Sequence, residues 1–167
     1  SFDMDADSLI HIARPKDSHD RLYPISMGRY GPTVAVPRIL ETYWRLGIKQ
    51  SFFLPGWCIE TYPDAVEAIL KGGHEIGHHG YLHEDPIDAP DQRAWFEKAL
   101  EAHHKYCGGK PSGYRAPVYN INQEVLDLLV EYGFRYDSSM MADDIPYQLE
   151  TSKGQLWEMP VHWGTDD

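Results

Sequence analysis

The alternation of strand-like and helix-like segments is the feature of this sequence that most restricts its fold. Apolar side chains recur at helical spacing in four segments, residues 36–46, 62–71, 91–106 and 123–132. Six segments are typical of strands: a short one that begins at Phe2, and residues 48–54, 74–78, 114–116, 134–137 and 155–163. Between the first strand and the first helix, a long loop is predicted by the turn residues Pro15, Pro24, Gly28, Gly31 and Pro32. Six strands joined by four helices predict an α/β domain with a parallel sheet.

Length and charge exclude several classes of protein. The 167 residues suit one domain with a hydrophobic core, spanning residues 1–167. There are 15 Lys and Arg against 26 Asp and Glu, a formal net charge of −11, which argues against nucleic acid or an anionic membrane as partner. No apolar run approaches the roughly 20 residues that span a bilayer. Cys58 and Cys107 suggest no disulfide framework, which favours a reducing, cytoplasmic location.

Polar side chains gather where the predicted strands end. In α/β folds the chemistry sits at the carboxyl ends of strands. The residues at such positions are Asp3, Asp5, His78, His79, Arg115, Asp137 and His162. They are therefore candidates for one shared site.

Four of the nine histidines fall within ten residues and form two pairs with a spacing of four, His74/His78 and His79/His83. Neutral imidazoles bind zinc-like metals well. A single pair of histidines with this spacing, however, often has only a structural role. In an extended strand, His74 and His78 would lie more than about 12 Å apart. His79 and His83 follow the strand, where a site is expected, and are the better pair.

Asp3 and Asp5 would share one face of the first strand if the strand continues through Met4. Two close carboxylates both stay charged only where a cation or an arginine compensates, so one could bind a metal while the other acts as a base. A solvated acidic strand end is the alternative. Asp7 is expected to cap the residues that follow it. Arg115, at another strand end, could hold an acid in its ionised form.

Three segments in this order resemble the polysaccharide deacetylase family, which shares the NodB homology domain. They are residues 2–5 (Phe-Asp-Met-Asp), residues 73–83 (Gly-His-Glu-Ile-Gly-His-His-Gly-Tyr-Leu-His) and residues 115–119 (Arg-Ala-Pro-Val-Tyr). The resemblance extends from Phe2 to Trp163. It implies a distorted (β/α) barrel, which is incomplete here because a full barrel needs about 250 residues. Since the chain lacks an initial methionine and stops just after an apolar run, we expect a domain truncated at both ends.

The resemblance also implies roles for particular residues. Asp5, His79 and His83 would bind a divalent metal, with zinc preferred and cobalt, iron or nickel as alternatives. Asp3 would be the base that activates water, and Arg115 would hold Asp3. Backbone donors near Val118 and Tyr119 would stabilise the oxyanion.

Three departures from the common family pattern stand out. Met4 separates two aspartates that are usually adjacent, and Gly80 stands where Ser or Thr is usual. The late histidine that would protonate the leaving amine has no counterpart before Asp167. His162 could line the site but is not equated with that histidine, so the general acid is expected beyond Asp167.

The Asp-x-Asp spacing, residues 79–83 and residues 136–140 resemble one branch of the family. This branch contains peptidoglycan-deacetylase-like proteins, allantoinase-type ureide hydrolases and cyclic imide hydrolases. It implies a homo-oligomer, a tetramer in particular, with a sugar or another small molecule as substrate.

We therefore expect a metal-dependent hydrolase of non-peptide C–N bonds that removes N-acetyl groups from an amino sugar or a peptidoglycan-like substrate. The first alternative is a cyclic imide or ureide amidohydrolase, and the second is a non-catalytic metal-binding domain. A serine hydrolase is disfavoured because the Gly-x-Ser-x-Gly motif is absent. A four-histidine zinc store at residues 74–83 would leave the aspartates unexplained.

Overall fold

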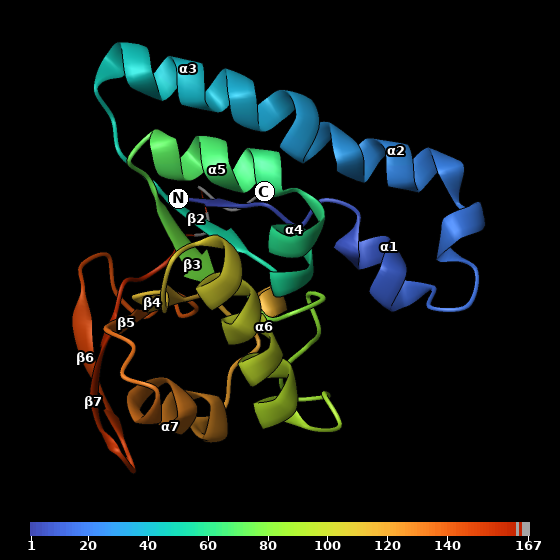
Figure 1. The fold of residues 1–167 in the computed structure, drawn as a ribbon. Helices are drawn as coiled ribbons and strands as arrows, with labels where there is room; N and C mark the ends of the chain where they lie inside the picture. The colour runs from blue at the N-terminus through green and yellow to red at the C-terminus, as the bar shows by residue number, and fades with distance from the viewer. Residues whose placement is uncertain (163, 165–167) are drawn as a thin grey trace.

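The computed structural model describes residues 1–162 and 164. A seven-stranded sheet in the order β1-β2-β3-β4-β5-β7-β6 forms its centre (Figure 1). The strands are β1 (Phe2–Asp3), β2 (Ser51–Leu54), β3 (Glu75–His78), β4 (Gly113–Tyr114), β5 (Tyr136–Asp137), β6 (Tyr147–Thr151) and β7 (Gly154–Glu158). All neighbouring pairs are parallel except the β6–β7 hairpin. Among the described residues no pairing joins β1 to β6, so the sheet is open, as an incomplete barrel requires.

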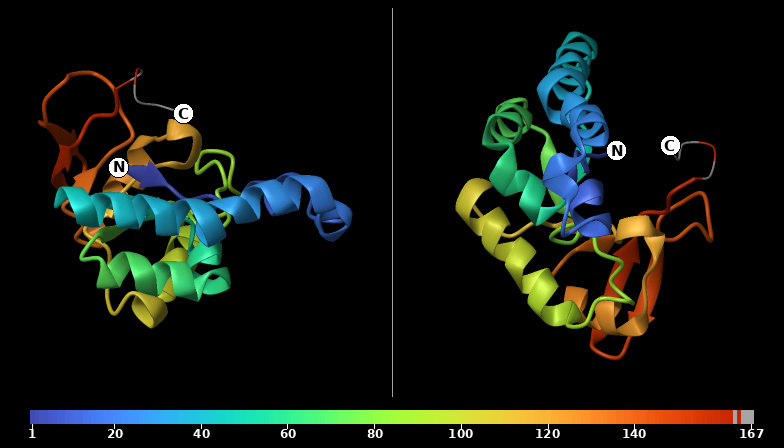
Figure 2. Two further views of the ribbon diagram at one scale, coloured as in Figure 1. Left: turned by 90° about the horizontal axis from the view of Figure 1, so that it is seen from above. Right: turned by 90° about the vertical axis from the view of Figure 1, so that its right-hand side faces the viewer.

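Seven α-helices accompany the sheet. They are α1 (Ser8–Ala13), α2 (Leu22–Tyr30), α3 (Val36–Leu46), α4 (Gly56–Thr61), α5 (Pro63–Lys71), α6 (Gln92–Tyr106) and α7 (Gln123–Glu131). Helices α2 and α3 run on from one another as a long rod, and α1 and α2 reach beyond the rest of the molecule (Figure 2). None of the helices in the described ranges is both long and apolar enough to cross a membrane.

Two hydrophobic clusters attach helices to the sheet. The first joins β2 and β3 to α4 and α5, with Phe52 and Ile69 fully buried. The second joins β4 and β7 to α6 and α7 around Tyr114 and Leu129. Burying side chains of this size contributes about 1.5–3 kcal/mol each. These clusters fix the strands from which the polar residues at the carboxyl edge project.

The long loop predicted for residues 7–35 is wrong, because most of this segment is helical. It contains α1, α2, a 3-10 turn (Ser18–Asp20) and a π-helical turn (Gly31–Ala35) that leads into α3. Pro24 lies in the first turn of α2, where its missing N–H has no intrahelical partner to lose. Gly28 allows α2 to pack closely against the backbone of Ala6, since a Cβ at position 28 would lie 2.6 Å from the carbonyl oxygen of Ala6.

Other boundaries also differ from the prediction. Helix α4 and strand β6 were not expected, and the helix predicted from residue 62 begins at Pro63. The last strand ends at Glu158, not at residue 163, so His162 lies beyond it. Trp163, the far end of the family resemblance, lies outside the described residues.

Candidate active site

The candidate residues of the site come from three parallel strands whose carboxyl ends meet at one edge of the sheet. Asp3 ends β1, His79 follows β3 and Arg115 follows β4. Met4 continues the β1 ladder by donating its N–H to the carbonyl oxygen of Phe53, and its own side chain is buried in the core. The strand alternation therefore places Asp3 and Asp5 on the side opposite Met4.

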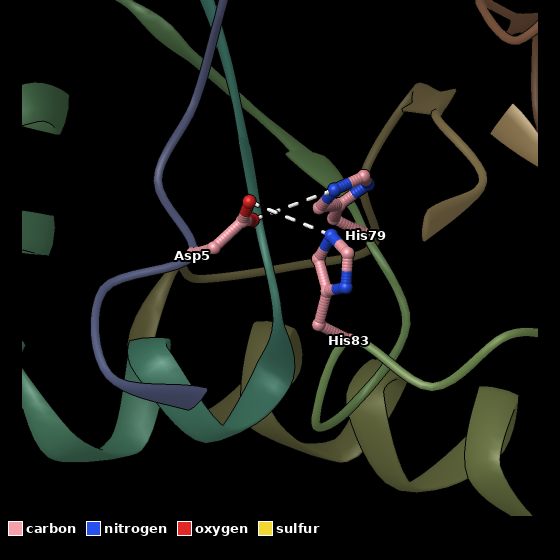
Figure 3. Close-up of side chains that lie close together, drawn as sticks. All are labelled: Asp5, His79 and His83. Carbon is pink, nitrogen blue, oxygen red and sulfur yellow. Dashed lines mark ion pairs between the residues drawn. The ribbon is translucent and has the colours of Figure 1, made fainter. Parts of the chain in front are cut away.

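Asp5, His79 and His83 point toward one another (Figure 3). One potential ligand atom from each lies within 4.8 Å of the others, and this is the only such group in residues 1–162 and 164. Nε2 of His79 lies 3.5 Å from Oδ1 of Asp5, and Nε2 of His83 lies 3.4 Å from Oδ2. Ligand atoms in a tetrahedral zinc site, with bonds of about 2.0–2.1 Å, lie about 3.3 Å apart. The donor set fits a divalent metal, and each histidine nitrogen lies close to this spacing from one oxygen of Asp5.

The ring of His79 is oriented by the backbone. Its Nδ1 lies 2.7 Å from the carbonyl oxygen of Arg115, which can only accept, so Nδ1 carries the proton and Nε2 presents its lone pair to the site. Burial lowers the pKa of both His79 and His83, against the opposing effect of the nearby carboxylates. Both imidazoles therefore stay neutral, as a metal ligand must be, to lower pH than an exposed histidine.

The loop that carries His83 is held by the buried carboxylate of Glu84. Its oxygens accept hydrogen bonds from the backbone N–H groups of Tyr81, at 2.9 and 3.1 Å, and of Leu82, at 2.7 Å. Two further backbone bonds tie the loop to the start of α4. Gly80 is required because its φ is +69° and because a Cβ would lie 2.8 Å from Oε1 of Glu84. This role of Glu84 was not predicted from the sequence, although an acid directly follows His83 and a glycine stands four residues before that acid.

Gly80→Ala is expected to lower the free energy of unfolding by about 2–3 kcal/mol, because left-handed backbone strain adds to a steric clash. Gly47→Ala is the matched control. Gly47 has a similar φ of +66° and no atom within 4 Å of an added Cβ, so strain alone should cost about 1–2 kcal/mol. Urea unfolding of both variants measures the difference. Equal losses would show that Glu84 does not restrict position 80.

Arg115 is buried and contacts Asp3 directly. Its Nη1 donates to Oδ1 of Asp3 at 2.6 Å, while Oδ2 of Asp3 lies 3.8 Å from Nε2 of His79. The guanidinium group also lies 4.2 Å from the centre of the Phe53 ring. Asp3 is thus held beside the Asp5/His79/His83 group without belonging to it, with one oxygen on Arg115 and the other toward the site.

Strained backbone surrounds this group. The four non-glycine residues with positive φ in the described chain are Ala6, His83, Val118 and Tyr119. Ala6 and His83 adjoin or belong to the proposed ligand set, and strain of this kind concentrates at functional sites. The amide of Tyr119 donates to the carbonyl oxygen of Ala116 at 3.0 Å, so this N–H is already used within the chain. Of the two predicted oxyanion donors, the amide of Val118 stays a candidate.

Several histidines and acids named from the sequence lie elsewhere. His74 accepts a hydrogen bond from the backbone N–H of Gln50, and His78 stacks on Phe96 in the core. His162 is exposed and is not part of the ligand group. Asp7 makes no side-chain cap, which corrects the prediction.

The buried carboxylate of Asp7 has a different use. It accepts a hydrogen bond from the hydroxyl of Tyr62 and lies 3.4 Å from Nε of Arg29 and 3.5 Å from Nε2 of His11. These contacts tie the segment that follows Asp5 to α1, to α2 and to the start of α5. Periodicity could not show the contacts with Arg29 and Tyr62, because these partners are 22 and 55 residues away, whereas His11 lies one helical turn from Asp7.

Comparison with known proteins assigns the family. The sequence model of the polysaccharide deacetylase family matches residues 30–136, more than half of the chain. The chain therefore belongs to the polysaccharide deacetylase family, and the predicted resemblance is confirmed.

Individual relatives agree with this assignment. A peptidoglycan deacetylase of Helicobacter pylori is 29% identical over 193 aligned positions, which cover 100% of this chain and 66% of that protein. The structure of a Mycobacterium smegmatis protein classed as a polysaccharide deacetylase is 40% identical, with a TM-score of 0.91 over 97% of this chain and 57% of that one. An allantoinase structure is 26% identical, with a TM-score of 0.75 over 84% and 48%. The chain thus spans between 48% and 66% of these three proteins, and the two solved structures confirm the NodB-type α/β fold.

Proposed function

We propose that this chain forms the catalytic centre of a metal-dependent hydrolase of non-peptide C–N bonds, which removes N-acetyl groups from an amino sugar or a peptidoglycan-like substrate. One observation carries the proposal. A carboxylate held by a buried arginine, Asp3, lies beside a separate group of three potential metal ligands, Asp5, His79 and His83. A purely metal-binding domain has no need of a second carboxylate and its arginine. The peptidoglycan deacetylase of H. pylori supports the choice of substrate.

The roles of the residues follow from their contacts. A bound divalent cation would lower the pKa of water toward neutrality and polarise the substrate carbonyl group. Asp5, His79 and His83 would bind this cation through one oxygen and two Nε2 atoms. Oδ2 of Asp3 faces the ligand group and would accept the proton from the attacking water, while Arg115 keeps the carboxylate in place through Oδ1. The amide of Val118 would donate to the developing oxyanion.

A ureide or cyclic imide amidohydrolase is the second candidate, favoured by the likeness to the allantoinase structure. Both reactions require attack of water on an amide carbon, so the residues just described serve either one. The two candidates differ in the product. Removal of an acetyl group releases acetate, whereas hydrolysis of a cyclic substrate opens its ring.

The test uses the full-length protein loaded with zinc, with and without chelator. We expect chelator-sensitive release of acetate from N-acetylglucosamine oligomers and no ring opening of a cyclic imide or a ureide. Ring opening without acetate would replace the first candidate by the second. Metal uptake without hydrolysis of any of these substrates would favour the non-catalytic alternative and overturn the proposal.

A further inference from the structure

A second buried polar cluster lies next to Arg115, at the carboxyl ends of β5 and β7. It consists of Asp137 and Glu158, which face each other in the strand register, and of Ser138 and Ser139. All four side chains are buried, with 4% exposure or less. Buried polar groups are retained at a cost unless their hydrogen bonds are satisfied, so the partners of this cluster indicate what it does.

The two serines contact both the side chain and the backbone next to Arg115. Nε of Arg115 donates to the carbonyl oxygen of Ser138 at 2.9 Å, and Nη2 donates to Oγ of Ser138 at 2.8 Å. The amide of Ala116 donates to Oγ of Ser139 at 2.9 Å. Segment 138–140 therefore orients the guanidinium group, whose remaining nitrogen reaches Asp3.

The two carboxyl groups in turn fix this segment. Oδ1 of Asp137 accepts from the hydroxyl of Ser139 at 2.7 Å, and Oδ2 accepts from its amide at 3.2 Å. Oε1 of Glu158 accepts from the amide of Met140 at 3.0 Å. Burial raises the pKa of both carboxyl groups, and the neighbouring carboxyl group of Glu158 raises the pKa of Asp137 further.

We propose that Asp137, Ser138, Ser139 and Glu158 are positioning residues that act through Arg115 on Asp3. Asp137 and Glu158 fix segment 138–140, this segment orients the guanidinium group, and the guanidinium group aims Asp3 at the ligand group. The inference rests on the proposed function for its effect on catalysis. The orientation of Arg115 itself does not depend on that function.

The central test is a double-mutant cycle between Ser138→Ala and Arg115→Lys in the full-length, zinc-loaded protein. Ser138→Ala should lower kcat about tenfold with KM and bound zinc unchanged, because it removes one hydrogen bond to a charged group. In the Arg115→Lys background the same change should have almost no further effect, since lysine lacks the planar fork that reaches both Ser138 and Asp3. Ser138→Thr keeps the hydroxyl and should restore most of the lost kcat.

A second readout is independent of activity. In the wild-type protein, nuclear magnetic resonance should resolve separate signals for the Nη groups of Arg115, because rotation of the guanidinium group is restricted. In Ser138→Ala and in Asp137→Asn these signals should merge. Ser152→Ala is the control for the loss of a serine hydroxyl, because Ser152 is exposed, donates to the carboxylate of Asp127 and belongs to another part of the chain.

The outcomes separate the two proposals. Restricted Arg115 signals that merge in the variants, in a protein without hydrolase activity, would support the positioning role and refute the proposed function. Additive losses in the cycle, or unchanged Arg115 signals in Ser138→Ala, would overturn the positioning role. A loss of bound zinc together with kcat in Ser138→Ala would also overturn it, because the cluster would then support the fold and not Arg115 alone.

Discussion

His79→Ala and His83→Ala should each abolish stoichiometric metal binding, with an affinity loss larger than the roughly 10- to 100-fold expected for a residue that only supports a ligand. Each change removes one of three donors whose ligand atoms lie within 4.8 Å of one another. Equilibrium dialysis with zinc, followed by elemental analysis, measures the remaining metal. Hydrolase activity should disappear with the metal.

His74→Ala is the control for these two variants. His74 is buried and belongs to the other histidine pair, but it contacts Tyr43, Phe52 and the backbone N–H of Gln50. This variant should lose some stability and keep its full complement of zinc. Loss of zinc in His74→Ala, or full retention in His79→Ala or His83→Ala, would show that the wrong pair was chosen.

Asp3→Asn should retain zinc and lose activity by about 100- to 10,000-fold, the range for removal of a general base. The amide keeps the size of the side chain and an oxygen that can accept from Arg115, but it cannot accept a proton from water at neutral pH. The measurement is kcat for the substrate identified above, together with the zinc content of the same sample.

Asp5→Asn separates the roles of the two aspartates. Asp5 contacts both histidines of the ligand group and Asp3 contacts Arg115, although only Met4 stands between them. Asp5→Asn should therefore lose zinc, whereas Asp3→Asn should not. If Asp3→Asn retained normal activity, Asp3 would not be the base. If both variants lost zinc equally, the two carboxylates would act as one ligand pair.

The order of strands and helices could be predicted from the sequence because it depends on local periodicity. All six predicted strands and all four predicted helices occur near their expected positions, as do the chain segments that bring Asp3, His79 and Arg115 to one edge. The choice of His79 and His83 over His74 and His78 needed only the length of an extended strand. The structure brings His79 and His83, and not His74 and His78, together with Asp5.

Turn residues misled the prediction where tertiary packing used them differently. Gly28 and Pro24 suggested a loop, but α2 needs Gly28 to pass close to the backbone of Ala6. Asp7 suggested a helix cap, yet its carboxylate contacts side chains from distant elements. In each case the decisive contact spans 20 residues or more, a distance at which sequence periodicity carries no information.

The sequence by itself therefore determined the α/β class, the edge of the sheet at which the candidate residues meet, and the three segments that resemble the family. Only the tertiary structure decided how these segments are supported. It placed the carboxylate of Glu84 against Gly80 and that of Asp7 in contact with side chains of α1 and α2. It also placed the buried Asp137–Glu158 pair beside the segment that contacts Arg115. The physical reason is that hydrophobic periodicity depends on residues that are close together in the sequence. Hydrogen bonds to a buried charge, by contrast, join residues that become neighbours only when the sheet has formed.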